Sequence, residues 1–592
     1  MEDRHHSWLW GIFLAAIVLV AYACTLNAGF IWDDDAHLTN NPCVIGPLGF
    51  HEIWTTSHAY YYPLVLTTFW FLHKFVGLNP LPYHLLNVLV HAGSAILLWR
   101  VLRELGVRGA WFGAALWALH PVMVESVAWI TELKNTQSAF FYLLSILFFL
   151  KSDAEESDPR MRRWRYAISL LFFGMAIASK SSTVMLPIVL LLCLWWKRER
   201  IGLRDAVRLT PFVLVSLASS VWTIWEQKFH SGALGSEFNL AWPERFALAG
   251  RDLCFYLGKL FWPHPLIYLY PRWQPATGTL FWIAVFAFFI VAVVFLLIVR
   301  ATRTRPIAFA GAYFVVSLFP VLGFFNVYFF RYSFVSDHFQ YLAAIGPLAL
   351  LGSAIAVGLS AFDLPSITRR FGYAAVLITL AAITFRQTLI YHNPETLWRN
   401  TIEKNPAAWL AHLNLGVLLK EKGDPDAAKA EYDQALQLNP NSYEALNVLG
   451  VWELQRGRVE EGISNLRTSL KLYPSYAFAS FNLGNALLQQ GKLDEAITSL
   501  QDAVRSDPDY ADAHGNLAVA LSRANRLEEA VPHYKEALQW KPNDSGVHYN
   551  FGIVLAQLGR NQEAAAQFKE ALRLKPDYED AKARLRGLGY SD

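Results

Sequence analysis

The chain has 592 residues, of which 54% are hydrophobic and 17% charged, whereas about a quarter of the residues in an ordinary soluble domain are charged. Its formal net charge of +3 combines a net +8 before Asn393 with a net −5 from Asn393 onward. Neither part is basic enough to predict nucleic-acid binding, so we expect an apolar, mildly basic part joined to an acidic soluble part. The four cysteines form no CxxC pair, and we interpret them as packing residues rather than as disulfides or metal ligands: Cys24, Cys43, Cys193 and Cys254.

Apolar runs close to the length that crosses the hydrocarbon recur over the first two thirds of the chain. We expect eleven membrane spans, near residues 8–26, 83–102, 110–130, 137–151, 165–179, 182–196, 209–227, 277–299, 306–325, 342–360 and 372–390. The first run also fits a signal peptide, because Ala21-Tyr22-Ala23 has the form of a cleavage site. We interpret it as an uncleaved anchor, since many further spans follow.

Lysine and arginine clusters predict the orientation of these spans, because such clusters favour the cytoplasmic side. With the N-terminus inside, all the clusters face the cytoplasm: 100–108, 160–165, 197–208, 300–305 and 369–370. This agreement requires the charged stretch 246–262 to lie in the outer interface without crossing. Residues 50–77, rich in aromatic residues and histidine, are likewise expected to form a surface or re-entrant helix. An odd number of spans places everything after Ile390 outside.

The last third of the chain contains a 34-residue repeat. Its most regular mark is a proline at every 34th position: Pro406, Pro440, Pro474, Pro508, Pro542 and Pro576. This period is typical of tetratricopeptide repeats, in which each unit is a pair of antiparallel helices. We expect five repeats starting near residues 409, 443, 477, 511 and 545, with residues 394–406 capping the stack against the membrane and 578–588 capping its far end. The predicted fold is all-α: a polytopic transmembrane domain over 1–392, then a tetratricopeptide superhelix over 393–592.

Polar residues that suggest chemistry gather at the predicted outer ends of the spans. They are Asp33, Asp34 and Asp35; His120, Glu125, Glu132 and Lys134; Lys180; and Arg331, Asp337, His338 and Tyr341. A carboxylate among aromatic side chains can accept a proton from an attacking hydroxyl. A cation such as Lys180 or Arg331 can stabilise the charge on a phosphate leaving group. The pattern therefore favours transfer from a lipid-linked phosphate to an acceptor on the outer face.

Each of these residues also has a structural interpretation. The aspartate run fits a solvated loop that caps a helix, and His120 before Pro121 fits a hydrogen-bonded histidine at a helix end. Lys180 lies at a tight turn and could extend its ammonium group to the interface. Glu125 lies in a predicted span, where an unpaired acid is costly, so it favours a function or an ion pair.

Several stretches resemble the transmembrane and tetratricopeptide repeat (TMTC) family of O-mannosyltransferases, particularly its bacterial members. They are "FIWDDD", "YYPLVLTTFW", "GLNPLPYHLLNVLVHA", "ALHPVMVESVAWITELKN", "SKSSTVMLPIVLLL" and "DHFQYLAAIGP", all between residues 30 and 347. The resemblance implies a GT-C glycosyltransferase, which takes a sugar, usually mannose, from a polyprenyl phosphate. It places the sugar on a protein Ser or Thr hydroxyl outside the cytoplasm, in a single in-line displacement with inversion.

The resemblance also implies roles for individual residues. The family's paired acids match Asp33 and Asp34, one of which would be the base. Its histidine and acid of the third span match His120 and Glu125, and its lysine after the fifth span matches Lys180. Together with Arg331 or His338, these residues would bind the donor and its phosphate, although many relatives have Arg where His338 stands. A divalent metal held by the aspartates remains open, and we assign no metal ligand and no resident cofactor.

The sequence thus predicts a glycosyltransferase of the plasma membrane, with its repeats on the extracytoplasmic side. Its expected partners are a membrane lipid carrier as donor, an acceptor protein, and further proteins bound by the repeats, but no nucleic acid. The main alternative is a non-catalytic membrane scaffold whose repeats assemble envelope or secretion machinery. A weaker alternative is a transporter of the lipid carrier.

Overall fold

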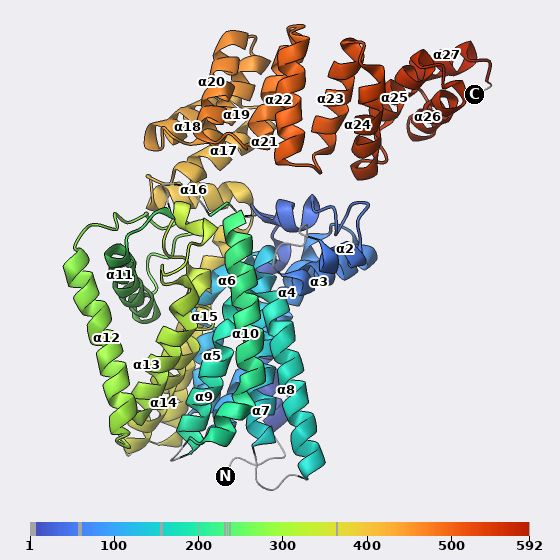
Figure 1. Ribbon diagram of the computed structural model, residues 1–592. Coiled ribbons are helices and arrows are strands. Elements are labelled where there is room, and N and C mark those ends of the chain that lie inside the picture. Colours follow the sequence, from blue (N-terminus) through green and yellow to red (C-terminus); the bar gives the residue numbers. More distant parts are fainter. Residues whose placement is uncertain are drawn as a thin grey trace. The chain divides into compact units, whose positions relative to one another are not determined.

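The computed structural model describes residues 7–56, 62–153, 158–198, 201–229, 232–233, 235, 238–362 and 365–590. Throughout these residues the regular secondary structure is helical, and no strand occurs (Figure 1). The predicted all-α fold is therefore confirmed. The chain forms two compact units, one of residues 1–44 and 50–408 and the other of residues 45–49 and 409–592. The domain boundary at 392/393 stays a prediction.

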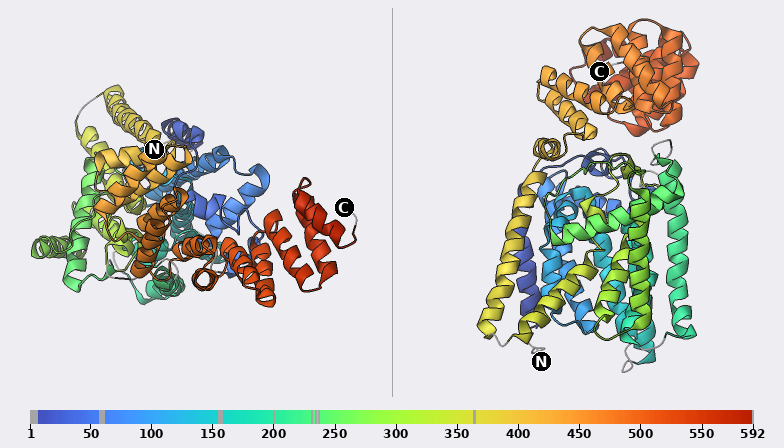
Figure 2. Two further views of the ribbon diagram at one scale, coloured as in Figure 1. Left: turned by 90° about the horizontal axis from the view of Figure 1, so that it is seen from above. Right: turned by 90° about the vertical axis from the view of Figure 1, so that its left-hand side faces the viewer.

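The first unit contains a helix for each of the eleven predicted spans. The helices are α1 (Ser7–Ala21), α4 (Pro80–Glu104), α5 (Ala110–Ala118), α7 (Leu133–Ser152), α8 (Pro159–Ser179), α9 (Leu186–Lys197), α10 (Leu203–Phe229), α12 (Thr279–Val299), α13 (Arg305–Leu318), α14 (Ile345–Ala361) and α15 (Ser366–Thr388). The long helices run side by side in Figure 2. Five are long and apolar enough to cross a membrane, and several shorter apolar helices accompany them, which fits a membrane protein. The number of spans stays a prediction.

The predicted span over 110–130 is not one continuous helix. After α5 the chain extends at His120, forms a 3-10 turn at Pro121–Met123, and continues as the short α6 (Val124–Ala128) and the turn η6 (Ile130–Glu132). Proline lacks an N–H group and disfavours a helical conformation in the residue before it. The chain therefore leaves the helix at His120, and the residues after the break lie in the interior of the bundle.

Shorter helices cover the end of the bundle near this break. They are α2 (Phe50–Thr55), α3 (Pro63–Val76) and α16 (Pro394–Lys404), together with α11 (Trp242–Phe261), which lies across the direction of the long helices (Figure 2). The helix α11 is the charged stretch that we expected in the outer interface. The helix α16, expected to cap the repeats, belongs to the first compact unit.

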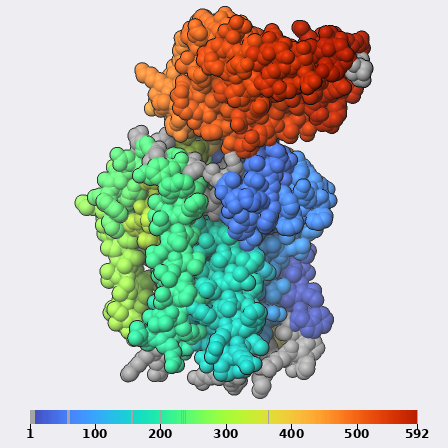
Figure 3. Space-filling view, turned by 45° about the vertical axis from the view of Figure 1, so that its right-hand side comes forward, coloured from blue at the N-terminus to red at the C-terminus, as the bar shows by residue number. Residues whose placement is uncertain are grey.

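The second unit consists of helix pairs, each beginning at the predicted repeat start. The pairs are α17 (Trp409–Glu421) and α18 (Pro425–Leu438), α19 (Tyr443–Gln455) and α20 (Val459–Leu472), α21 (Ala477–Gln489) and α22 (Leu493–Ser506), α23 (Ala511–Arg523) and α24 (Leu527–Trp540), and α25 (Ser545–Gln557) and α26 (Asn561–Leu574), followed by α27 (Glu579–Gly587). Within a pair the helices approach so closely that a Cβ atom at Gly416 would lie 2.5 Å from the Tyr432 ring. Neighbouring repeats pack side by side along the orange to red surface in Figure 3.

Candidate functional site

The loop after α1 carries two adjacent aspartates with different environments. The Asp34 side chain is fully buried and accepts hydrogen bonds from the backbone N–H of Ile31 at 2.8 Å, the N–H of Thr131 at 2.8 Å, and the Thr131 hydroxyl at 2.5 Å. Burial raises the pKa of Asp34 to about 7, although these hydrogen bonds oppose the rise. Asp34 thus joins the loop to the segment after the helix break.

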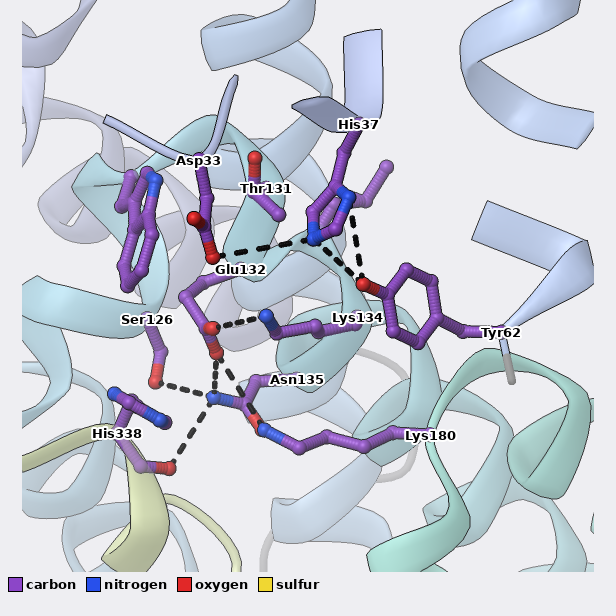
Figure 4. A network of polar contacts seen from close by, with 12 residues as sticks. Asp33, His37, Tyr62, Ser126, Thr131, Glu132, Lys134, Asn135, Lys180 and His338 are labelled. Carbon is purple, nitrogen blue, oxygen red and sulfur yellow. Dashed lines mark hydrogen bonds and ion pairs between the residues drawn. The ribbon is translucent and has the colours of Figure 1, made fainter. Parts of the chain in front are cut away.

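The side chain of Asp33, by contrast, is 38% exposed. Its Oδ2 lies 4.0 Å from Nε2 of His37, and Figure 4 shows the carboxylate directed toward the centre of a polar network. Burial raises the pKa of Asp33 to about 6, while the positive charge of Lys134 opposes the rise. Asp33 is therefore the more accessible of the two carboxylates.

Glu132 lies at the centre of this network. Its side chain is 0% exposed, and its two oxygens form ion pairs with Lys134 Nζ at 2.8 Å and Lys180 Nζ at 3.5 Å (Figure 4). A buried carboxylate is stable only when it is paired, and here one acid pairs with two cations. Burial lowers the pKa of Lys180 to about 8, and the nearby Glu132 carboxylate opposes that fall.

Asn135 connects the network to three further segments. Its Oδ1 accepts a hydrogen bond from Lys180 Nζ at 2.6 Å, and its Nδ2 donates to Ser126 Oγ at 3.1 Å and to the carbonyl of His338 at 3.2 Å. The same Nδ2 also donates to Glu132. The amide therefore fixes Lys180 relative to the segment that carries His338.

Aromatic rings complete the network on the side of Asp33. The ammonium group of Lys134 lies over the rings of Tyr62 and Trp129, 5.6 Å and 5.5 Å from their centroids. The Tyr62 hydroxyl lies 2.6 Å from Nε2 of His37, the imidazole that faces Asp33. Cations are attracted to ring faces, so these contacts hold Lys134 close to the Asp33 loop.

Glu125 and His338 form a separate buried pair beside the network. Glu125 accepts hydrogen bonds from His338 Nδ1 at 2.9 Å, from Ser336 Oγ at 2.9 Å and from the backbone N–H of His338 at 3.2 Å. The carboxylate therefore fixes the direction of the His338 ring. The expectation that Glu125 has a function or an ion pair stays a prediction.

His120 and Arg331 lie outside these contacts. Nδ1 of His120 accepts a hydrogen bond from the N–H of Val122, and Nε2 lies 3.1 Å from the carbonyl of Leu260 at the end of α11, so both nitrogens have partners within the protein. The guanidinium of Arg331 packs over the rings of Tyr328 and Tyr332. The structure thus brings together Asp33, Glu125, Lys180 and His338, whereas His120 bonds to the helix break and to α11, and Arg331 is buried against two tyrosine rings.

A cavity of about 200 Å³ opens beside Lys180. Its polar lining includes Lys180, Asn135 and His338. Its walls are largely apolar and include Met185, Ile224, Phe319, Val321, Phe339 and Leu342. An apolar space that ends at a buried ammonium group suits an amphipathic molecule with an anionic head.

The sequence did not assign roles to several residues that the structure places in the network. Glu132 and Lys134 were noticed at the outer end of a predicted span, whereas His37, Tyr62 and Asn135 were missed. The available signal was the run "TELKN", in which charged and amide residues directly follow a helix break and begin a new apolar helix.

A divalent metal held by the two aspartates stays a prediction. Both oxygens of Asp34 already accept hydrogen bonds. Within the described ranges, no three His, Cys, Asp or Glu side chains are arranged to hold a metal ion.

The fold defines a helical protein whose first unit has the apolar helices of a membrane protein and whose second unit consists of stacked helix pairs. Residues 57–225 match the family described as "Dolichyl-phosphate-mannose-protein mannosyltransferase". Residues 418–477, 481–548 and 521–586 match tetratricopeptide repeat families.

Curated relatives carry the name that the resemblance predicted. "Protein O-mannosyl-transferase TMTC2" of Mus musculus is 33% identical over 150 residues, which cover 23% of this chain and 18% of the relative. "Protein O-mannosyl-transferase TMTC4" of Homo sapiens is 26% identical over 194 residues, covering 28% of this chain and 26% of the relative. The chain thus spans about a fifth of the length of the first of these relatives. The predicted resemblance is confirmed.

Solved repeat proteins are similar to the second unit. "Crystal structure of MamA protein" is 27% identical and covers 30% of this chain and 94% of that chain, with a TM-score of 0.26. A TM-score this low carries no argument about function.

Proposed function

We propose that the protein is a membrane glycosyltransferase that moves a sugar, with mannose as the first candidate, from a polyprenyl-phosphate carrier to a protein Ser or Thr hydroxyl. The observation that carries the proposal is one connected network that contains an accessible carboxylate, Asp33, and two lysines paired with a single glutamate. The similarity to proteins named O-mannosyl-transferases supports the same reaction class.

Asp33 is the proposed general base. Its carboxylate accepts the proton of the acceptor hydroxyl while the hydroxyl oxygen attacks the anomeric carbon of the sugar. The bond between that carbon and the phosphate oxygen breaks, and its electron pair leaves with the polyprenyl phosphate. A single displacement of this kind inverts the anomeric configuration. Asp34 instead holds the loop, because its oxygens are occupied by Ile31 and Thr131.

Lys180 and Lys134 are the proposed cations for the leaving phosphate. Both ammonium groups are held by Glu132, and Lys180 also borders the apolar cavity. A preorganised positive charge in a water-poor site stabilises the negative charge that grows on the phosphate as the bond breaks. The cavity walls would hold the first isoprene units of the carrier.

The geometry and the resemblance favour different residues for the remaining donor contacts. His338 borders the cavity and is oriented by Glu125, so we keep both as donor-site residues. We propose no direct donor contact for His120, whose nitrogens have protein partners. Arg331, which is buried against Tyr328 and Tyr332, stays a proposed donor contact.

The positive-inside rule supports a site on the extracytoplasmic side of the plasma membrane, with the repeats in the same compartment. In this orientation the repeats would recruit the acceptor protein or a partner, because stacked repeats provide extended surfaces for binding proteins. No resident metal or cofactor is part of the proposal.

The test compares two neighbouring substitutions in the full chain, Asp33→Asn and Asp34→Asn. Each variant is reconstituted in vesicles with polyprenyl-phosphate mannose labelled in the sugar, and protein-bound label and thermal unfolding are measured. Asp33→Asn should lower transfer by about 100-fold or more with an unchanged unfolding temperature, because it removes the base. Asp34→Asn should lower the unfolding temperature, because an Asn amide cannot accept every hydrogen bond that Asp34 accepts.

Full transfer by the Asp33→Asn variant would contradict the assigned base. Wild-type protein that binds partners through the repeats but never transfers label would favour the scaffold. Movement of the intact carrier between leaflets without label transfer would favour the transporter.

A further inference from the structure

The helix that precedes the repeats packs against the loop that carries Asp33. Trp398 of α16 is 3% exposed, and its ring lies edge-on to Trp32 and Tyr268 at centroid distances of 6.0 Å and 5.6 Å. Trp32 is the residue directly before Asp33. A side chain that the sequence placed with the repeats therefore contacts the neighbour of the proposed base.

Two hydrogen bonds fix α16 in this position. Nζ of Lys404 donates to the carbonyl of Leu266 at 3.1 Å, and Nδ2 of Asn405 donates to the carbonyl of Leu269 at 2.9 Å. The carbonyls belong to the residues around Tyr268, which itself contacts Trp398. The helix and the 266–269 segment thus form one wall beside the Asp33 loop.

The backbone of Trp32 needs such support. Its φ of 38° lies in the left-handed region, which is unfavourable for a bulky residue. Such a conformation persists only where the surroundings determine it. Rings surround Trp32 on several sides: Trp129 stacks on it at 5.7 Å, and Tyr268, Tyr332 and Trp398 lie edge-on to it.

We propose that Trp398 is a positioning residue of the transfer site, whose ring holds Trp32 in its left-handed conformation and so fixes the direction of the Asp33 carboxylate. The inference rests on the proposed role of Asp33. It makes the segment between the last apolar helix and the repeats a working part of the transfer site rather than a cap of the repeat stack. Because α16 is followed directly in the chain by the first repeat helix, α17, this segment links the acceptor-recruiting part of the chain to the base.

Loss of this packing should also change how Asp33 titrates. Water would reach the loosened loop, and the pKa of Asp33, which burial raises, should fall toward its ordinary value. The charged and titratable groups that influence Asp33 from neighbouring segments are Asp34, Asp35, His37, Glu132, Lys134, Tyr268 and His338. None of them is replaced by a substitution at Trp398, and of these the ring of Tyr268 contacts Trp398.

The test uses Trp398→Ala and Trp398→Phe in the full chain, in vesicles with the labelled carrier. Trp398→Ala should lower the turnover number about 10-fold or more, because a small displacement of a reacting group has a large effect on rate. The Michaelis constant for the carrier should stay unchanged, since the lysines are untouched, and the acid limb of the pH profile should move to lower pH. Trp398→Phe, which keeps an apolar ring, should show a smaller change in the same direction.

Two other positions of α16 provide matched controls. Leu397 is also buried, so the variant Leu397→Ala should have a lower unfolding temperature, while the acid limb of its pH profile should stay at the wild-type position. Arg399, an exposed neighbour that pairs with Glu395, should tolerate Arg399→Ala without change. An acid limb that moves equally in Leu397→Ala, or that stays in place in Trp398→Ala, would overturn the inference.

A readout that needs no transfer separates this inference from the proposed function. A thiol introduced as Asp33→Cys should react with a water-soluble reagent several-fold faster when Trp398→Ala is also present, measured by mass spectrometry of the peptide. An unchanged labelling rate would contradict the positioning role, whereas a wild-type chain without transfer would contradict the proposed function alone.

Discussion

Two charged networks lie at the two ends of the same helix, α7, which by its 20 residues is about 30 Å long. At its first end Glu132 pairs with Lys134 and Lys180. Just past its other end Asp153 pairs with Arg198 and Arg208. Each network therefore has one acid shared by two cations.

The two networks differ in burial, in the balance of charge and in the type of cation. The arginines at the second end are 35% and 21% exposed, and Arg198 also pairs with a second acid, Asp205, at 2.5 Å. Glu132 is fully buried, and one of its lysines borders a cavity. Arginine holds carboxylates in a fixed planar geometry, whereas lysine is a compact, mobile charge. Both ends border a cavity, because Arg208 of the second network lines one together with Ser152 and Tyr166. The two ends therefore differ in the burial of the charged groups and in lysine in place of arginine, and not in sharing one acid between two cations.

The strongest test of this comparison is Glu132→Gln. Removing the carboxylate leaves two buried ammonium groups without their partner, so we expect a loss of about 3–5 kcal/mol in unfolding free energy and loss of transfer. Denaturant unfolding of the reconstituted protein and label transfer measure the two effects. A variant with normal stability and normal transfer would remove the distinction between the two ends.

The substitution Lys180→Met should affect function more than stability. It removes a proposed phosphate contact, so transfer should fall by about 100-fold, while the fold loses only one of the two partners of Glu132. Retention of the labelled carrier by the purified protein should fall in parallel. Lys197→Met, an exposed lysine at the end of α9, serves as the control and should keep full transfer.

Asp153→Asn should affect stability more than transfer. Loss of the shared carboxylate leaves Arg198 and Arg208 with weaker partners at a partly exposed position, so we expect about 1–3 kcal/mol less stability. Transfer per folded molecule should remain at the wild-type level. A fall in transfer as large as that of Lys180→Met would show that the second network also takes part in the reaction.

The smallest expected effect is the pH dependence of transfer. Burial raises the pKa of Asp33 to about 6, and the proposed base must be deprotonated, so the rate should rise as the pH increases through this value. A pH series of initial rates under saturating carrier measures this limb. The same limb should appear in Asp153→Asn, because that residue lies at the far end of α7. A rate that falls as the pH rises through this range would contradict a carboxylate base.

The repeats were the part of the fold most fully predictable from the sequence. A 34-residue period with proline at each exit places every repeat start at the first residue of a helix, from Trp409 to Ser545. The apolar helices of the first unit were also predictable, because long apolar runs need only local hydrogen bonds to fold as helices. The break after Ala118 was not predicted, although Pro121 supplied a signal for it.

The candidate site was predicted in its residue types but not in its roles. Sequence placed Asp33 and Asp34 side by side, and nothing local distinguishes two adjacent carboxylates. Their difference comes largely from Thr131, nearly a hundred positions later, which donates two hydrogen bonds to Oδ1 of Asp34, while the N–H of Ile31 donates to Oδ2. In the same way, nothing near His120 in the sequence indicates that its Nε2 lies 3.1 Å from the carbonyl of Leu260. Its donor contact stays a prediction.

By itself the sequence determined the helices, the repeat and the set of polar residues, because these follow from hydropathy, periodicity and residue chemistry along the chain. Only the tertiary structure decided which carboxylate stays accessible, which lysines share Glu132, and that Trp398 contacts the residue before Asp33. The physical reason is that burial, pairing and ring contacts depend on segments far apart in the chain, and their distances are set by packing rather than by sequence spacing.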